Sequence, residues 1–428
     1  MSTSGSTELN FLDQFTKTFE LFSYGNALYG RLCSHILLGQ KLRNLKLYFG
    51  PIYIDPRVSL FLIQPSGTGK STPWNFIRDI ALKAQMAADD IDEATDAALI
   101  GTCEEEEVID PETHQKTVIY NAIQGKLANS DLLHYDEGQM LVKRGQYSQN
   151  TLAWLQKALN PIDSGQNLVS KYLAKLKSPI QFHPHCSLLI TSHEIDCLLE
   201  VVLDTGFFQR IVLYPRYVPI ESRKKNEFLR ADRFCKRIFT EIDVDTIAAK
   251  LVEVGKKYEN WEIQVDENIY PVIHQKIADM YALINTAHER VREIMATFVP
   301  RYDNLIYIFA LHHCCANLKD KVDVEDVKYA SQLMVELFKD IMSWVEENIS
   351  ILKLSSKELS YLNSAFIIYK GMEKTDEGYV MKISFMKECC AKWKISMHTI
   401  IRYLEKFQGF GKLKEVELNN TKFIKIEA

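Results

Sequence analysis

The chain has 428 residues, of which 46% are hydrophobic and 25% are charged, and its net charge is −5 at pH 7. These proportions are ordinary for a globular protein, so they exclude a largely disordered or fibrous chain, and the length suffices for about three domains. The slightly negative charge excludes a protein that binds nucleic acid over its whole surface, so any such surface must be local.

Cysteine usage and the N-terminal sequence indicate an intracellular protein. The nine cysteines contain no C-x-x-C pair, which fits a reducing compartment better than a disulfide framework. The N-terminal residues MSTSGSTELN lack the basic and apolar regions of a signal peptide. No apolar run approaches the about 20 residues that span a bilayer, so we expect a cytoplasmic protein without a membrane partner.

The spacing of apolar residues divides the chain into four segments. It predicts an N-terminal helical segment over residues 1–46, and over 47–220 an α/β layer in which a buried parallel sheet alternates with helices. The pattern is helical over 221–350 and changes over 355–428 to short helices followed by two β-like runs. The predicted strands of the sheet are Leu60–Ile63, Leu132–Tyr135, Ser187–Ile190 and Ile211–Tyr214.

Two stretches within the α/β segment have the pattern of inserted β-hairpins. EEVIDPETHQKTVIY, residues 106–120, has an Asp-Pro turn between two β-like runs. NLVSKYLAKLKSPIQF, residues 167–182, is a second hairpin with lysines near its tip.

The stretch FLIQPSGTGKSTPWNFI, residues 61–77, has the pattern of a strand, a phosphate-binding loop and the start of a helix. Its glycines let backbone N–H groups point at phosphates, Lys70 would contact the β- and γ-phosphates of ATP, and the Ser71 hydroxyl would bind Mg²⁺. Gln64 stands where the pattern usually has its first glycine, a position that makes no essential contact with phosphate. The predicted ATP-binding residues are Ser66, Gly67, Thr68, Gly69, Lys70, Ser71 and Thr72.

An acidic strand end, the second requirement of a P-loop ATPase, is present in DLLHYDEG, residues 131–138. Asp136 would hold Mg²⁺ through water, and Glu137 would polarise the attacking water. A glutamate at the second position favours hydrolysis over kinase chemistry. The alternative is an ordinary exposed turn after a strand.

Two further segments add residues at defined positions. CSLLITSHEID has the form of a sensor strand between the phosphate-loop strand and the acidic strand, with Ser192, or Thr191 as second choice, near the γ-phosphate. DTGFFQRIVLYPR places Arg210 before the last strand, where it would reach the ATP of a neighbouring subunit. The alternatives are a plain polar strand end and a salt-bridged arginine at a sheet edge.

In this order the motifs resemble AAA+ ATPases of the helicase branch that contains MCM and the viral superfamily 3 helicases. They are most similar to the helicase-like domains of mobile-element and phage primase–helicase proteins. The resemblance implies an AAA+ P-loop core with hairpin insertions over 47–220, a helical lid over 221–350 and a ring, most often a homohexamer.

GFFQRIVLY is similar to the family's arginine-finger segment, with Arg210 in the arginine position. FVPRYDNLIYIFALHHCCANLKDKVDVEDVKYASQL resembles the lid segment that places Arg301 as the second sensor arginine. Gln64 and Ser192, the latter standing where MCM proteins carry asparagine, depart from the family pattern.

The resemblance also implies a DNA contact for the second hairpin. MCM and superfamily 3 proteins carry a hairpin just before the sensor strand, pointing into the ring channel with a lysine on single-stranded DNA. Here the candidates are Lys171, Lys175 and Lys177, and lysine suits phosphate contacts that carry no base information. The alternative is an ordinary solvated hairpin.

The C-terminal segment resembles a winged helix. Its order is helix, short turn, a helix starting at the N-cap candidate Ser396, then two strands around NNT. Residues 355–428 contain 13 Lys or Arg and 9 Asp or Glu, a local net charge of +4. DNA contact through Lys394, His398 and Arg402 and a protein-docking role both remain open.

Together these features predict an ATP-dependent DNA helicase or translocase that acts as a ring in the replication of a mobile element, phage or plasmid. Its cofactors would be ATP and Mg²⁺, its substrate single-stranded or forked DNA, and any priming would come from a separate primase or polymerase. One alternative is an AAA+ replication initiator or loader that binds DNA as an ATP-dependent switch without unwinding it. A second is a P-loop adaptor in mobile-element defence or transposition.

Overall fold

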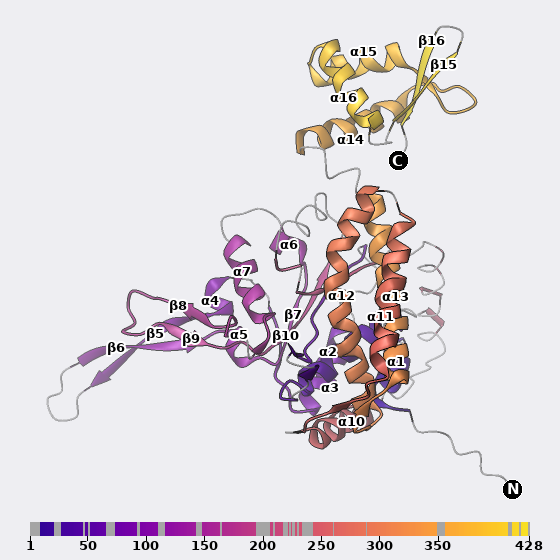
Figure 1. Ribbon diagram of the computed structural model, residues 1–428. Coiled ribbons are helices and arrows are strands. Elements are labelled where there is room, and N and C mark those ends of the chain that lie inside the picture. The colour runs from indigo at the N-terminus through magenta and orange to yellow at the C-terminus, as the bar shows by residue number, and fades with distance from the viewer. Residues whose placement is uncertain are drawn as a thin grey trace. The chain divides into compact units, whose positions relative to one another are not determined.

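The computed structural model of the chain divides into two compact units, Met1–Trp344 and Val345–Ala428 (Figure 1). The predicted N-terminal segment, the α/β layer and nearly all of the helical segment thus fall within the first unit. The structure describes every residue except 1–8, 21–26, 46–47, 50–51, 66–72, 92–94, 110–115, 143–147, 163–164, 194–205, 209, 217–220, 222–223, 225–226, 229–230, 233–242, 260, 288, 349–355, 410–412, 419–420 and 427–428.

A five-stranded parallel sheet, in the order β11-β3-β10-β7-β4, forms the centre of the first unit. Every residue of β3, β7, β10 and β11 is buried, which explains why these strands are mostly apolar and do not alternate with polar residues. Four predicted strands and the α/β class are therefore confirmed. The fifth strand, β4, was not predicted because it has three residues, two of them aspartate. The strands are β3 (Leu60–Ile63), β4 (Ala88–Asp90), β7 (Leu132–Tyr135), β10 (Ser187–Ser192) and β11 (Val212–Pro215).

The position of β10 decides which segments meet. It pairs in parallel with β3 on one side and β7 on the other, so that Ile190 lies opposite both Phe61 and Tyr135. This confirms the prediction that the strand lies between the phosphate-loop strand and the acidic strand. Because the strands are parallel, their carboxyl ends share one edge of the sheet.

The N-terminal helices pack into the α/β layer rather than forming a separate body. α2 packs on β3 and β10, and α1 packs on α2. The Asn10 side chain caps α1 by accepting a hydrogen bond from the Asp13 backbone N–H (3.0 Å). The Phe15 ring of α1 lies 5.3 Å from the Phe76 ring of α3. These helices, with the neighbouring α10, are α1 (Phe11–Phe19), α2 (Ala27–Lys41), α3 (Trp74–Lys83) and α10 (Val244–Lys257).

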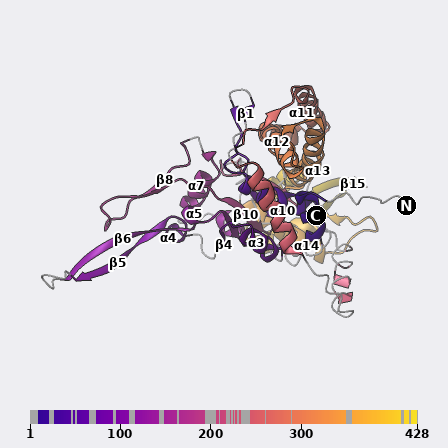
Figure 2. The ribbon, with the colours of Figure 1, turned by 90° about the horizontal axis from the view of Figure 1, so that it is seen from below.

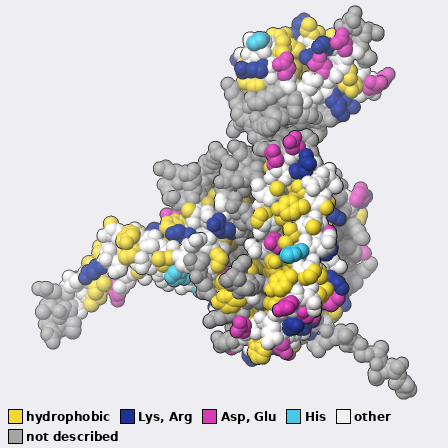
Figure 3. Space-filling model, viewed as in Figure 1, with side chains coloured by type: hydrophobic (Ala, Val, Ile, Leu, Met, Phe, Trp, Pro, Cys, Tyr) yellow, Lys and Arg dark blue, Asp and Glu magenta, His cyan; other side chains and the backbone are white. Residues whose placement is uncertain are grey.

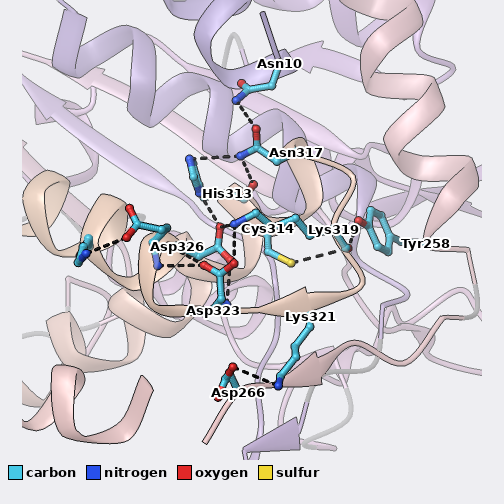
Figure 4. Close-up of polar contacts among 12 residues, drawn as sticks. Asn10, Tyr258, Asp266, His313, Cys314, Asn317, Lys319, Lys321, Asp323 and Asp326 are labelled. Atoms are coloured by element: carbon cyan, nitrogen blue, oxygen red, sulfur yellow. Dashed lines mark hydrogen bonds and ion pairs between the residues drawn. The ribbon is translucent and has the colours of Figure 1, made fainter. Parts of the chain in front are cut away.

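Three long helices, α11 (Ile269–Asn285), α12 (Glu289–Ala316) and α13 (Val324–Asn348), lie side by side (Figures 1 and 2). All of them belong to the first unit except the end of α13 beyond Trp344. The turn between α12 and α13 contains β13 (Lys321–Val322), which pairs with β12 (Gln264–Val265). Figure 4 shows the polar network at this turn, centred on the fully buried carboxylate of Asp326. That carboxylate accepts hydrogen bonds from His313 Nδ1 (2.6 Å), Lys319 Nζ (3.0 Å) and the Asp323 backbone N–H (3.0 Å).

Both predicted hairpins are confirmed. β5 (Gly101–Ile109) and β6 (Lys116–Gln124) form an antiparallel ribbon that projects from the unit, and β8 (Val169–Lys171) and β9 (Ile180–Phe182) form the second hairpin beside it (Figures 1 and 2). Hydrophobic side chains lie exposed along the ribbon (Figure 3). The remaining short elements among the described residues of the unit are β1 (Tyr48–Phe49), β2 (Ile52–Tyr53), α4 (Asp96–Leu99), α5 (Lys126–Asn129), α6 (Gln139–Val142) and α7 (Ser148–Ala158).

The described residues of the second unit form three helices and a three-stranded antiparallel sheet in the order β14-β16-β15. Ser396 caps α16 as predicted, because its hydroxyl accepts a hydrogen bond from the Thr399 backbone N–H (3.3 Å). A core of its own includes the buried side chains of Phe385, Ile400 and Phe407. The elements are α14 (Ser356–Gly371), β14 (Val380–Met381), α15 (Lys382–Trp393), α16 (Met397–Gly409), β15 (Leu413–Leu418) and β16 (Thr421–Ile426).

Candidate nucleotide and nucleic-acid sites

The predicted phosphate loop joins two described elements. β3 ends at Ile63 and α3 begins at Trp74, so the loop connects the carboxyl end of a central parallel strand to a helix N-terminus, as phosphate-binding loops do. Gln64 is 3% exposed, and its backbone N–H donates to the Ser192 carbonyl (3.0 Å), which extends the pairing of β3 with β10. The loop residues themselves lie outside the described part of the chain: Ser66, Gly67, Thr68, Gly69, Lys70, Ser71 and Thr72.

Asp136 follows β7 at the same edge of the sheet. Its Oδ1 accepts hydrogen bonds from Thr191 Oγ1 (2.6 Å) and from the backbone N–H of Glu137 (3.0 Å). Thr191 is fully buried in β10. Because Asp136 follows β7, which pairs with β10, this hydrogen bond links the ends of two neighbouring strands. Thr191, the second choice for a phosphate contact, therefore orients the Asp136 carboxylate.

Glu137 occupies a tight turn directly after Asp136. Its φ of 65° lies in the left-handed region, which is uncommon for a residue with a side chain. The next residue is glycine, and a Cβ at Gly138 would come within 2.5 Å of Ile190 Cγ2, so any other residue would require the packing to shift. The Glu137 side chain is exposed, and its Oε2 accepts a hydrogen bond from Gln139 Nε2.

Ser192 completes this group at the end of β10. Its side chain is fully buried, and its hydroxyl lies 3.2 Å from Gln139 Oε1 and 2.9 Å from the His193 carbonyl oxygen. The structure thus brings Asp136, Glu137 and Ser192 together where β3 leads into the predicted loop. Gln139 was missed at the sequence level, because a glutamine after D-E-G carries no local signal.

The side chain of His134, in β7, packs against the start of α3. Its ring stacks on Trp74, the first residue of α3, with centroids 4.7 Å apart, and its Nδ1 lies 2.8 Å from Asp90 Oδ1. Burial lowers the pKa of His134, and the opposing effect of Asp90 is smaller. The ring is therefore neutral at neutral pH and adds no positive charge beside β7.

Arg210 lies at the amino ends of the parallel strands, whereas the carboxylates lie at their carboxyl ends. It precedes β11, which runs parallel to β3 with Val212 opposite Leu60. A four-residue strand spans roughly 13 Å, which separates Arg210 from the carboxyl ends of the strands. Its exposed side chain donates from Nε to Asn160 Oδ1 (2.8 Å). The other predicted arginine, Arg301, lies within α12, and its side chain is outside the described residues.

The three lysines of the β8–β9 hairpin differ in their surroundings. Lys171 Nζ donates to the carbonyl of Gly101 (3.2 Å), and Lys175 forms an ion pair with Glu105. Both partners belong to the β5–β6 ribbon. Lys177 is exposed, and among the described residues no hydrogen bond or ion pair engages its side chain.

The ribbon surrounds Lys175 with a carboxylate and an aromatic ring. Glu105 and Tyr120 are directly opposite across β5 and β6, and Lys175 Nζ lies 4.9 Å from the Tyr120 ring centroid. The hydrogen bond to Lys175 lowers the pKa of Glu105, and the same bond raises the pKa of Lys175. Tyr172, at the hairpin tip, is 81% exposed, so it does not contribute to core packing.

In the second unit, the predicted DNA contacts lie on exposed positions. Lys394 follows α15 with a φ of 54°, and His398 and Arg402 are one turn apart on α16. All three side chains are exposed. The Arg402 guanidinium lies 5.7 Å from the centroid of the Tyr403 ring.

Comparison with known proteins adds no identification, since no family model and no curated protein matches the chain. Within the described residues, no helix is both long enough and apolar enough to cross a membrane. In the same part of the chain, no three or more His, Cys, Asp or Glu side chains are grouped to hold a metal ion.

Proposed function

We propose that the chain is an ATP-dependent DNA helicase or translocase of the AAA+ class. One observation carries the proposal: β10 lies between β3 and β7, so that Asp136, Glu137 and Ser192 meet where β3 leads into the phosphate-loop sequence. A strand inserted between the loop strand and the acidic strand is the arrangement that the AAA+ resemblance implies. It supports hydrolysis, because phosphates at this edge would face a carboxylate pair.

The residue types of the phosphate-loop sequence and of this sheet edge fit ATP and Mg²⁺. Ser71 and Asp136 offer hydroxyl and carboxylate oxygens, the ligands that Mg²⁺ prefers, and Lys70 offers a positive charge to the phosphates. Bound Mg²⁺-ATP supplies the phosphoanhydride bond that is cleaved. Glu137 polarises the attacking water, while Thr191 keeps the Asp136 carboxylate in place.

The position of Arg210 favours a ring oligomer, and we propose a homohexamer. The residue lies at the sheet edge opposite the nucleotide of its own chain, yet its side chain is exposed. An arginine in that position is available to the ATP of a neighbouring subunit, where it offsets charge that develops during hydrolysis. Arg301 is proposed to act at the same interface.

The proposed substrate is single-stranded or forked DNA. The β8–β9 hairpin precedes the sensor strand and offers lysines to phosphates, with Lys177 exposed and Lys171 and Lys175 held by the ribbon. The helices and antiparallel sheet of the second unit support a winged helix with Lys394 and Arg402 as a further contact. We place this activity in the replication of a mobile element, phage or plasmid, in the cytoplasm, with a separate primase or polymerase.

An ATPase assay with and without single-stranded DNA, beside strand displacement on forked DNA, tests the proposal. Lys70→Ala is expected to abolish ATP binding or hydrolysis, because it removes the charge that holds the phosphates. Glu137→Gln is expected to bind ATP and turn it over poorly. If the wild-type protein neither binds nor hydrolyses ATP, with or without DNA, the proposed ATPase activity is refuted.

A replication initiator or loader is a second candidate, favoured by the ion pair between Lys175 and Glu105. In that case Lys171 and Lys175 stay held by the ribbon, and the second unit alone binds DNA. The triple variant Lys171→Ala, Lys175→Ala and Lys177→Ala separates the candidates. A helicase should lose unwinding and keep its DNA-free ATPase, whereas a loader should keep its DNA binding.

A further inference from the structure

Gln139 is a buried amide whose two ends are both engaged. Its side chain is 1% exposed, at the first residue of α6, between the ends of β7 and β10. Nε2 donates to Glu137 Oε2, and Oε1 lies 3.2 Å from the Ser192 hydroxyl. The Glu137 carboxylate sets the direction of this amide, because the opposite orientation would place two oxygens against each other.

Ser192 lies at the closed end of this chain of contacts. Its side chain is fully buried, and its one hydroxyl proton has two protein acceptors, Gln139 Oε1 at 3.2 Å and the His193 carbonyl at 2.9 Å. A hydroxyl donates to one acceptor at a time. Ser192 is therefore placed to act on other residues of the chain rather than to reach outward to a ligand.

Glu137 lies at the open end. Its backbone is held by the turn, since Asp136 Oδ1 accepts its N–H (3.0 Å) and Gly138 is packed against β10. Its exposed carboxylate has χ-angle freedom that this turn does not remove. Among the described residues, Gln139 is the side chain that hydrogen-bonds to this carboxylate.

We propose that Gln139 is a positioning residue, anchored by Ser192, that holds the Glu137 carboxylate toward the attacking water. The inference rests on the proposed ATPase function and assigns Ser192 a role through Gln139. No bond is made or broken in this step. A carboxylate held in one direction aligns the water, and a loss of alignment of about 1 Å lowers rates by about 100-fold.

Gln139→Met tests the proposal, because methionine has a similar length and makes no strong hydrogen bond. We expect kcat for ATP hydrolysis to fall by about 10- to 100-fold, while the Kd for ATP, measured by titration with a fluorescent ATP analogue, changes by less than about threefold. We also expect non-additivity. Ser192→Ala combined with Gln139→Met should lower kcat no further than Gln139→Met alone, because both remove one linked chain of contacts.

Gln40→Met is the matched control at the other end of the same strand. Gln40 is also 1% exposed, its Oε1 accepts from the Ser187 hydroxyl (3.0 Å), and its Nε2 donates to the His185 carbonyl (2.9 Å). Ser187 begins β10 and Ser192 ends it. Gln40→Met should lower the thermal midpoint and leave kcat of the folded protein within about twofold.

The outcomes separate the two proposals. If the wild type hydrolyses ATP and Gln139→Met keeps kcat within about twofold, or adds its full effect to Ser192→Ala, the positioning role is wrong and the ATPase stands. If the wild type does not bind or hydrolyse ATP, both proposals fall. Should Gln139→Met not fold, Gln139→Glu, which sets a second carboxylate against Glu137, is expected to show the same loss of kcat at unchanged ATP affinity.

Discussion

Mild acid is expected to destabilise the first unit through two buried histidines. His35 of α2 and His312 of α12 are fully buried, with their Nδ1 atoms 3.0 Å apart. His312 Nε2 lies 2.8 Å from the Pro56 carbonyl oxygen, so Nε2 carries the proton and Nδ1 accepts one from His35. His35 Nε2 then accepts from the Tyr329 hydroxyl at 3.2 Å. A proton added to His312 would set two N–H groups against each other, so the network requires neutral rings.

The size of the effect follows from the pKa values. Burial lowers the pKa of His312 from 6.5 to about 4, and burial, His312, His313 and Arg31 lower the pKa of His35 well below its usual value. The unfolded chain takes up the His312 proton near pH 6.5, whereas the folded chain does so near pH 4. Stability is therefore full above pH 6.5 and falls by about 1.4 kcal/mol per unit below it, which amounts to about 2 kcal/mol at pH 5.

Urea unfolding followed by circular dichroism at pH 7, 6 and 5 measures this loss, with His312→Gln for comparison. The variant is expected to be less stable at pH 7, because glutamine cannot satisfy both contacts, and to lose less stability on acidification than the wild type. His274→Gln, at an exposed position of α11, should keep the wild-type slope. Equal slopes for the wild type and His312→Gln would refute the reasoning.

Three further predictions concern single positions. Asp326→Ala should lower the free energy of unfolding by about 3–5 kcal/mol, because it strips a buried network of its central carboxylate. Glu325→Ala, at a neighbouring exposed position, should change it by less than about 0.5 kcal/mol in the same urea experiment. Gly39→Ala should destabilise by about 1–3 kcal/mol, since its Cβ would lie 2.3 Å from the Pro56 carbonyl oxygen; a thermal midpoint equal to the wild type would contradict the packing. Glu105→Gln should tighten single-stranded DNA binding and steepen its salt dependence by a slope of about 0.7, because it releases one hairpin lysine; unchanged binding in fluorescence anisotropy would count against that contact.

The local pattern of apolar and turn residues was sufficient to predict much of the fold. Strands buried on both faces are mostly apolar, so β3, β7, β10 and β11 could be predicted with boundaries at most two residues off. The hairpins were predicted from turn residues between β-like runs. β4 was not predicted, because a three-residue strand with two aspartates contains no apolar run. The length of the β5–β6 ribbon was also not predicted, because exposed strands lack a buried face that would mark their ends.

Residue chemistry identified the candidate carboxylates but not the contacts that hold them. The sequence by itself determined that Asp136, Glu137 and Ser192 stand at strand ends, because each follows or ends an apolar run. Tertiary structure alone decided that Thr191 bonds to Asp136, that Gln139 joins Glu137 to Ser192, and that a ribbon glutamate holds Lys175. Three of these contacts, Thr191 to Asp136, Gln139 to Ser192 and Lys175 to Glu105, join residues 53 to 70 positions apart in the chain. They depend on strand order and register. Local propensity and periodicity act over a few residues, so they cannot specify which distant side chains the register brings within hydrogen-bonding distance.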